Sequence, residues 1–374
     1  MHTPATSYRL AVDTDDGTFT VTARQTHTYR IHLAQGLITG AFSDHLRALA
    51  EQLEVSQIVL AIDAAAAEDH LGVIGAAVAR TGLPMGVVQV PAANPGSLPD
   101  GLSSLVRAPQ QRRPLLLGVG SDVVCTMVRT AAARHLPGLP YALVPTTVQA
   151  QIEAGTDSNP GVGHGAPDQR HGAYPHHHPA AVYIDPALTS TLPPRDVRAG
   201  LAEAIKLALI INPLLFHLLE KAAGPLPAGP ALAAIVEQAV ASRLMLLALE
   251  PERQLLALGH RVADPYQAAT GHRILPGEAV AAGIAVAAAH AFLSGKSTLE
   301  HRDRILNLLA AYQLPVTLPV ELRQPVWEAM AARRHASHDP LSVVIPQRPG
   351  LCTLIDDFDR PAYDKALDDL AARP

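Results

Sequence analysis

Short apolar runs alternate with helical patterns through the first half of the chain. The apolar, β-rich runs cover residues 57–62, 85–90, 114–117 and 141–144. Apolar residues at helical spacing occur at residues 44–53, 67–80, 98–108 and 122–134. Strands that alternate with helices predict a parallel sheet covered on both faces, which is the α/β class. Nearer the N-terminus, residues 18–23 and 29–33 alternate apolar and polar positions, which predicts a hairpin or paired edge strands.

The second half of the chain has a different pattern. From Pro194 onward almost every apolar repeat is helical, apart from a strand-like run at residues 343–346. With 374 residues, the chain is long enough for two domains. We therefore predict an α/β domain of dinucleotide-binding type over residues 1–190 and an all-α domain over residues 191–374.

One predicted helix carries a charged pair close to its apolar face. Pro193 and Pro194 end the preceding segment, and proline fits only the first turn of a helix, so a helix is predicted over residues 195–211. Its apolar stripe consists of Val197, Leu201, Ile205 and Ala208. Glu203 and Lys206 are three residues apart and share a face near that stripe. Buried charges are paired, bind a metal or face a ligand, whereas a surface ion pair is the simpler alternative.

Two glycines follow the predicted strand at residues 114–117. Gly118 and Gly120 lie in the segment GVGSD, just before a helix that starts near Asp122. Glycines let the backbone approach a pyrophosphate, and the N-terminus of a helix offers free N–H groups to its charge. Asp63 ends the strand that begins at residue 57, where a carboxylate can accept a hydrogen bond from a ribose hydroxyl. A lone GxG is equally typical of any tight strand-to-helix turn.

Composition disfavours several kinds of partner. The net charge of −5, the low aromatic content and the lack of basic clusters argue against nucleic acid. No run approaches the roughly 20 uninterrupted apolar residues of a membrane span, and the N-terminus carries no export pattern, so we expect a cytoplasmic protein. Cys125 and Cys352 are too few for a disulfide framework or a thiolate metal site.

A long irregular stretch at residues 155–179 is rich in histidine. It contains His164, His171 and three consecutive histidines at residues 176–178. Loops of this length within a domain are usually functional or disordered. Three consecutive histidines cannot all face one metal ion from an extended chain, so surface decoration is favoured over a metal site.

Six segments together resemble one enzyme family. In chain order they are GVGSD (118–122), VPTTVQAQIE (144–153), AAVYID (180–185), TLPPRDVRAGLAEAIK (191–206), LLALGH (255–260) and LPGEAVAAGIAVA (275–287). Their content and order resemble the sugar phosphate cyclases, the dehydroquinate synthase family. The blocks VPTT and TLPPRDVRAGLAEAIK are the most specific, and the resemblance extends over residues 57–370.

The resemblance implies a fold and a reaction. Family members combine an NAD-binding α/β domain with a helical domain, carry a divalent metal, usually zinc, in the cleft, and usually form homodimers. They close a phosphorylated ketose into a carbocycle through transient oxidation by bound NAD, phosphate elimination, re-reduction, ring opening and aldol addition. For this chain we therefore expect a small-molecule substrate and NAD, with cofactor contacts from the following residues: Asp63, Gly118, Gly120, Asp122, Thr146 and Thr147.

The resemblance also assigns metal ligands, and here the chain departs from the family. Glu203 and His260 match the first two ligand positions, but the third is Pro276, which has no side-chain donor. Asp264, one helical turn beyond His260, or His272 can be considered as a replacement. A site without metal is at least as good an interpretation.

Other family positions have changed as well, among them lysines and an arginine that reaches substrate phosphate in the family. The matching positions here are Glu153, Asn159, Gly163, Asp168, Pro137, Pro340 and Leu341. Lysine and arginine normally recognise phosphate, so their joint loss predicts that the standard seven-carbon phosphorylated substrate is not turned over.

Two interpretations of function follow. In the first, the chain is a divergent cyclase or lyase of specialised metabolism that acts on a small substrate. That substrate class includes compounds without a phosphate group. Glu203, Lys206, His260 and Glu278 would then be its acid–base groups. In the second, the chain is a non-catalytic relative that serves as a binding or partner protein. The retained GLAEAIK segment favours the first.

Overall fold

The computed structural model describes residues 5–12, 19–90, 114–134, 138–153, 177–337 and 342–373. These residues belong to two compact units. The α/β unit comprises Met1–His32, Leu37–Val144 and Asp157–Ile184, and the helical unit comprises Leu33–Gly36, Pro145–Thr156 and Asp185–Pro374.

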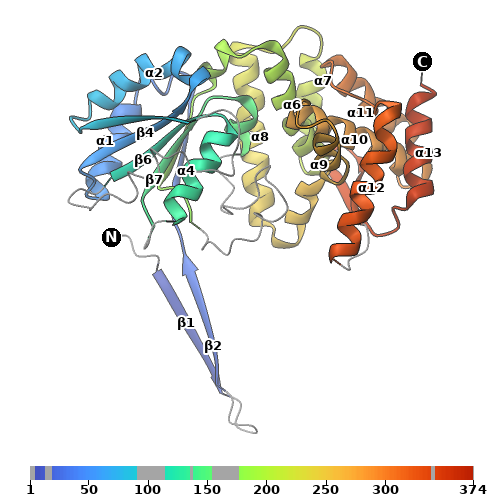
Figure 1. Ribbon diagram of the computed structural model, residues 1–374, viewed down its shortest axis with the longest axis horizontal. Coiled ribbons are helices and arrows are strands. Elements are labelled where there is room, and N and C mark those ends of the chain that lie inside the picture. Colours follow the sequence, from blue (N-terminus) through green and yellow to red (C-terminus); the bar gives the residue numbers. More distant parts are fainter. Residues whose placement is uncertain are drawn as a thin grey trace. The chain divides into compact units, whose positions relative to one another are not determined.

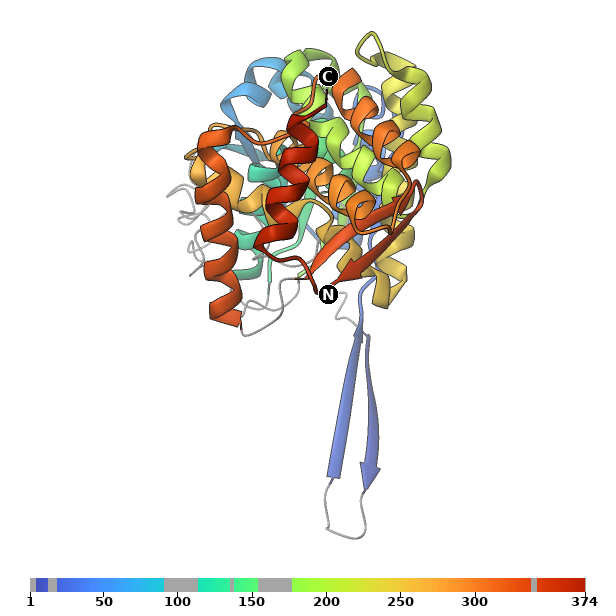
Figure 2. The same ribbon diagram turned by 90° about the vertical axis from the view of Figure 1, so that its right-hand side faces the viewer.

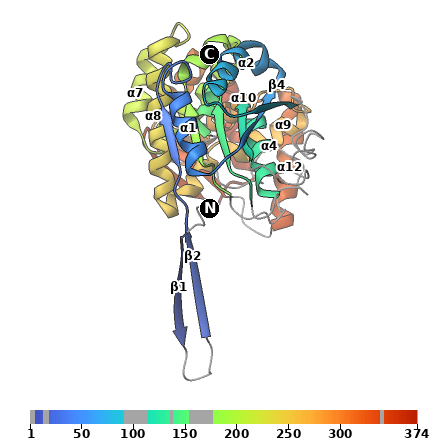
Figure 3. The ribbon, with the colours of Figure 1, turned by 90° about the vertical axis from the view of Figure 1, so that its left-hand side faces the viewer.

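A six-stranded sheet is the centre of the α/β unit (Figure 3). Its strands run in the order β3 (Arg30–Leu33), β8 (Ala181–Ile184), β7 (Tyr141–Pro145), β6 (Pro114–Gly120), β4 (Gln57–Asp63) and β5 (Met85–Val90). The register is parallel between β4 and β5, between β4 and β6, and between β7 and β8. The central strands are buried along almost their whole length, as expected for parallel strands with near-continuous apolar sequence. The predicted parallel α/β fold is confirmed.

Three helices complete the description of this unit. They are α1 (Phe42–Gln52), α2 (Ala64–Ala79) and α4 (Asp122–Arg134). Helix α2 packs on β4, β5 and β6, and α4 packs on β4 and β6. The helix predicted at residues 98–108 lies outside the described residues.

The predicted pairing of residues 18–23 with residues 29–33 is wrong. Strand β2 (Phe19–Thr26) instead pairs antiparallel with β1 (Ala5–Val12) in a separate two-stranded ribbon (Figure 1). Strand β3 joins the large sheet beside β8. Alternation of apolar and polar residues identifies a strand but does not select its partner, which long-range contacts decide.

The helical unit contains most of the remaining elements. These are α5 (Val148–Glu153), α6 (Pro194–Ile210), α7 (Pro213–Ala222), α8 (Gly229–Ala248), α9 (His260–Ala269), α10 (Pro276–Leu293), α11 (Leu299–Ala311), α12 (Val320–Ser337) and α13 (Arg360–Ala371), with 3₁₀ turns η2 (Pro186–Thr191) and η3 (Glu250–Ala257). A two-stranded antiparallel ribbon of β9 (Val343–Arg348) and β10 (Leu351–Ile355), drawn in red in Figure 2, completes it. The strand-like run at residues 343–346 is thus the first half of a hairpin.

Helix α10 is the core of the helical unit. It packs against α6, α9, α11 and α13, and most of its residues are buried. Close approach depends on glycine: a Cβ on Gly277 would lie 1.8 Å from the Ala199 carbonyl oxygen of α6. A Cβ on Gly283 would lie 2.1 Å from the Gly259 carbonyl oxygen, just before α9. These contacts fix the starts of α9 and α10 against the rest of the unit.

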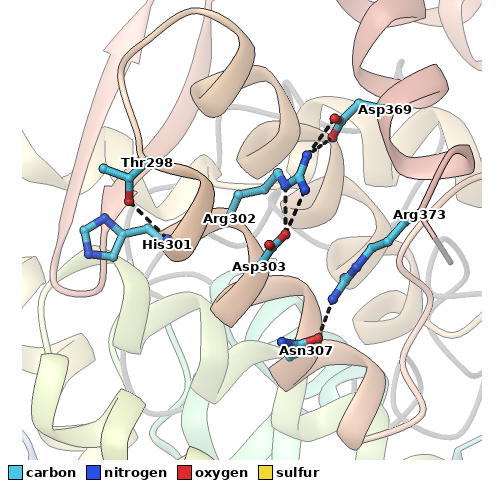
Figure 4. A network of polar contacts seen from close by, with 7 residues as sticks. All are labelled: Thr298, His301, Arg302, Asp303, Asn307, Asp369 and Arg373. Carbon is cyan, nitrogen blue, oxygen red and sulfur yellow. Dashed lines mark hydrogen bonds and ion pairs between the residues drawn. The ribbon is translucent and has the colours of Figure 1, made fainter.

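A polar network joins α11 to α13 near the C-terminus (Figure 4). Both Asp369 oxygens accept hydrogen bonds from Arg302 Nη1, at 2.6 and 2.7 Å. Arg302 Nη2 also donates to Asp303, at 2.8 Å, and Arg373 donates to Asn307. The network fastens the last helix to the unit.

Among the residues that the structure describes, two helices, α8 and α10, are long and apolar enough to cross a membrane by length and composition alone. In α10 the most apolar stretch is 78% buried inside the protein, and in α8 it is 44% buried. The apolar character of α10 is therefore that of a core helix.

Candidate active site

Helix α6 carries a buried ion pair. The side chains of Glu203 and Lys206 are only 4% and 1% exposed, and Lys206 Nζ lies 2.6 Å from Glu203 Oε2. Pro194 begins the helix in its first turn, so the pair lies in the middle of the helix, where its neighbours are also buried. Burial on this scale excludes the alternative of a surface ion pair.

His260 extends this pair from the neighbouring helix α9. Lys206 Nζ lies 3.2 Å from His260 Nε2. Since an ammonium group can only donate, Nε2 accepts, and the ring proton is on Nδ1. The left-handed backbone at Gly259 (φ +83°) turns the chain into α9 and places His260 first in the helix. On the other edge of the ring, Nδ1 lies 3.6 Å from Asp264 Oδ1.

Arg243 and Glu153 complete the cluster. Arg243 Nη1, from α8, donates to Glu203 Oε1 at 3.0 Å and lies 3.7 Å from Glu153 Oε1. Gln149 Nε2 donates to the other Glu153 oxygen, at 3.0 Å. Burial tends to raise the pKa of Glu153, but Arg243, Lys206 and the Gln149 amide outweigh it and hold that pKa well below its usual range.

Sequence reasoning did not identify Arg243, although a signal for it exists. Arg243 is the one charged residue in the apolar second half of α8, and a lone charge there predicts a buried partner. Glu153 was recognised as a changed family position, but not as a partner of a buried arginine.

Glu278 has different partners. Its two oxygens accept hydrogen bonds from Arg195 at 2.7 and 2.6 Å. It also accepts from the Leu275 backbone N–H at 3.0 Å, which caps the start of α10. Partial burial tends to raise the pKa of Glu278, but Arg195 and the Leu275 N–H lower it. These contacts give Glu278 a structural role, and none joins it to the Lys206 cluster.

The predicted cofactor residues of the α/β unit meet at the end of β4 and β6. Asp63 Oδ1 accepts from Ala66 N–H at 2.8 Å and caps α2, while Oδ2 accepts from Ser121 N–H at 3.3 Å. Gly120 has a φ of +147°, and a Cβ there would lie 2.6 Å from Asp63 Oδ2. Gly118 allows tight packing, since a Cβ would lie 3.0 Å from the side chains of Leu143 and Val128. Asp122 begins α4 directly after this turn.

The two predicted cofactor residues Thr146 and Thr147 lie in the helical unit. Thr147 Oγ1 accepts from Ala150 N–H at 3.2 Å and so caps α5, and Thr146 is buried beside it in the chain. A contact of either residue with NAD stays a prediction.

Comparison with known proteins identifies the family. Residues 94–199 match the N-terminal domain of 3-dehydroquinate synthase, and residues 200–336 match its C-terminal domain. The chain belongs to the 3-dehydroquinate synthase family. The resemblance inferred from the six sequence segments is thereby confirmed.

The relatives of this family member differ in how much of the chain they match. A protein of Stigmatella aurantiaca named 2-epi-valiolone synthase is 33% identical over 96% of this chain and 92% of its own. A 3-dehydroquinate synthase of Pseudoalteromonas translucida is 31% identical over 66% of this chain and 71% of its own. The structure of ValA, a 2-epi-5-epi-valiolone synthase of Streptomyces hygroscopicus solved with NAD⁺ and Zn²⁺ bound, shares the fold, with a TM-score of 0.81 and 24% identity over 95% of this chain and 100% of that one.

The described residues do not provide the family's metal site. Both Glu203 oxygens are taken by cationic side chains, Lys206 and Arg243, and His260 Nε2 is taken by Lys206. Pro276 is the first residue of α10, a position that suits proline but supplies no ligand. Within the part of the chain that the structure describes, no group of three or more His, Cys, Asp or Glu side chains can hold a metal ion.

Neither Asp264 nor His272 lies where it could bind a metal ion together with Glu203. Asp264 lies on the Nδ1 edge of His260, whereas Lys206 and Glu203 lie on the Nε2 edge, and the two ring nitrogens point in divergent directions. His272 is exposed beyond the far end of α9, a helix about 15 Å long that begins at His260.

The glycine turn fits NAD better. It follows a parallel strand, precedes a helix, and lies beside a carboxylate on the adjacent strand, as in dinucleotide sites. Only glycine at position 120 leaves room for the Asp63 carboxylate against the turn. We therefore name Asp63, Gly118, Gly120 and Asp122 as the residues that would hold the dinucleotide.

Proposed function

We propose that this protein is a divergent cyclase or lyase of specialised metabolism that acts on a small polyhydroxylated carbonyl compound. The observation that carries the proposal is the buried cluster of Glu203, Lys206, Arg243 and His260, in which every charge has a partner. The relative from Stigmatella aurantiaca supports the substrate class, because its alignment spans almost the whole of both chains.

The cluster contains the groups that elimination and ring closure need. Both reactions begin with loss of a proton next to a carbonyl, and the electron pair then moves towards the carbonyl oxygen. His260, about one-third exposed, is the member of the cluster that a small molecule can reach, and its ring takes the substrate proton at Nε2, in exchange for the hydrogen bond that Nε2 accepts from Lys206 in this structure. The Lys206 ammonium group provides fixed positive charge for the enolate oxygen that develops.

The buried acidic groups have a supporting role. Glu203, held by Arg243, holds the Lys206 ammonium group in place. Asp264 faces Nδ1 of His260 and orients the imidazole ring. The enolate electrons then either expel a β-substituent or add to a second carbonyl carbon and close the ring.

NAD, when bound, supplies reversible hydride transfer, and Asp63, Gly118, Gly120 and Asp122 are the residues we propose for it. We also propose that the protein is cytoplasmic and a homodimer, without nucleic-acid or membrane partners. Light scattering of the purified protein tests the dimer: the mass of a single chain would contradict it.

Turnover of a substrate panel tests the function. Purified protein is incubated with NAD and a set of ketoses, each with and without a phosphate group, and products are followed by ¹H NMR. We expect a carbocyclic or dehydrated product from at least one of them, lost in His260→Asn and kept in the control His217→Asn, a histidine whose side chain is 73% exposed.

Two results would contradict the proposal. Robust formation of dehydroquinate from the standard seven-carbon phosphorylated substrate would make the protein an ordinary member of its family. Absence of any product, together with tight binding of a panel compound, would favour a non-catalytic binding protein.

A further inference from the structure

The space between Glu203 and His260 is already occupied by a positive charge. Lys206 Nζ lies 2.6 Å from the Glu203 carboxylate and 3.2 Å from His260 Nε2. We propose that the Lys206 ammonium group replaces a divalent cation in this cluster, so that the cluster works without a bound metal ion. The inference rests on the same site as the proposed function, but it is tested by metal binding and not by turnover. A failed turnover experiment and a bound metal ion are therefore distinguishable results.

The Lys206 ammonium group and a metal ion cannot both lie between Glu203 and His260, because the distances leave room for only one of them. A zinc ion lies about 2.0–2.2 Å from carboxylate oxygen and imidazole nitrogen ligands. A metal ion bound to both Glu203 and His260 would therefore occupy the volume in which Nζ now lies. Lys206 is only 1% exposed, so a metal ion bound here would require a buried side chain to move.

Among the described residues that form ion pairs within the cluster, the charges balance without a metal ion. Lys206 and Arg243 are the cations, and Glu203 and Glu153 are the anions that they contact. A divalent ion added here would leave two uncompensated positive charges beside an ammonium and a guanidinium group. In a buried site such repulsion is only weakly screened.

Of the described residues, Pro276, Asp264 and Glu278 do not supply the missing ligand. Pro276 has no donor atom, and Asp264 is on the opposite edge of the imidazole ring from Glu203. Glu278 is held by Arg195 and by the start of α10. Two protein ligands fall short of the three that a catalytic zinc site uses.

Metal analysis of the purified full-length chain tests the inference. The protein is dialysed against Zn²⁺ or Co²⁺, then against metal-free buffer, and its metal content is measured by mass spectrometry. We expect no metal ion in the cluster, no Co²⁺ d–d absorption from it, and the same Tm with EDTA as with one equivalent of Zn²⁺. One metal ion per chain in the wild type that is lost in Glu203→Gln would overturn the inference. A metal ion that the Glu203→Gln variant still binds lies elsewhere in the protein, and that result is consistent with the inference.

A substitution tests the role of the ammonium group directly. Lys206→Met should lower Tm by several degrees, because it leaves the buried Glu203 carboxylate with a single cationic partner. The matched control is Lys221→Met, at an exposed lysine, with Tm unchanged. A Lys206→Met variant as stable as the wild type would overturn the inference, and if that variant fails to fold, the metal content of the wild type still decides.

Discussion

At the scale of single residues, the protein is distinguished by charges that are buried and paired. Arg243 contacts both Glu203 and Glu153 while its side chain is only 9% exposed. A buried pair contributes little compared with an apolar core, but breaking one side of it is costly, because the remaining charge is left without a partner. The cluster therefore holds its members in place more than it stabilises the fold.

Replacement of Arg243 should reveal this cost. Arg243→Met should lower the free energy of unfolding by about 3–5 kcal/mol, since Glu203 and Glu153 both lose a partner. Denaturant titration measures the loss. Arg195→Met is the control: its partner Glu278 keeps the Leu275 contact and Arg195 is 57% exposed, so we expect a loss below about 1 kcal/mol. Equal losses in the two variants would contradict the account.

The lowered pKa of Glu153 predicts a dependence of stability on pH. A carboxyl whose pKa is lower in the folded state stabilises the fold above its ordinary pKa of 4.5, and the contribution is lost as pH falls through the folded-state value. Stability measured from pH 6 down to pH 3 should therefore fall less steeply in Glu153→Gln than in the wild type. Parallel curves would show that Glu153 is not held ionised by Arg243 and Lys206.

At the scale of elements, the sequence reveals individual strands and helices more readily than their partners. The continuous apolar runs of β4, β6 and β7 and the proline-led helix α6 were predictable, because local periodicity and proline chemistry decide them. The pairing of β2 with β1 was not, since it depends on contacts between strands. Arg243 was missed for the same reason: its partners lie on α5 and α6, far away in the sequence.

Close helix packing through glycine is a second property of the elements. Gly283→Ala would place a Cβ about 2.1 Å from the Gly259 carbonyl oxygen and so push α10 away from the start of α9. We expect a loss of about 1–3 kcal/mol in unfolding free energy. The control is Gly75→Ala in α2, where the nearest atom is 3.8 Å away and the higher helix propensity of alanine should leave stability equal or slightly increased. A harmless Gly283→Ala would contradict the packing described for α9 and α10.

At the scale of the whole molecule, each unit has one cysteine within its core. Cys125 lies in α4 of the α/β unit and Cys352 in β10 of the helical unit, and both are buried. Burial raises the pKa of the Cys125 thiol to about 12 and also raises the pKa of Cys352. Both thiols should therefore be unreactive in the folded protein.

Thiol labelling then reports on the two units separately. With Ellman's reagent at pH 8, we expect no reaction of the native protein and reaction of both thiols in denaturant. Mass spectrometry at intermediate denaturant identifies which cysteine, and so which unit, opens first. Rapid labelling of either cysteine in the native protein would contradict the packing of its unit.

The central claim is that Lys206 is the cation of the cluster that also contains Glu203 and His260. A crystal grown with zinc, with diffraction recorded above and below the zinc absorption edge, tests this claim most directly. We predict that Lys206 Nζ lies between the Glu203 carboxylate and His260 Nε2, with no anomalous density there. An anomalous peak bound to Glu203 and His260, with Lys206 displaced, would contradict it.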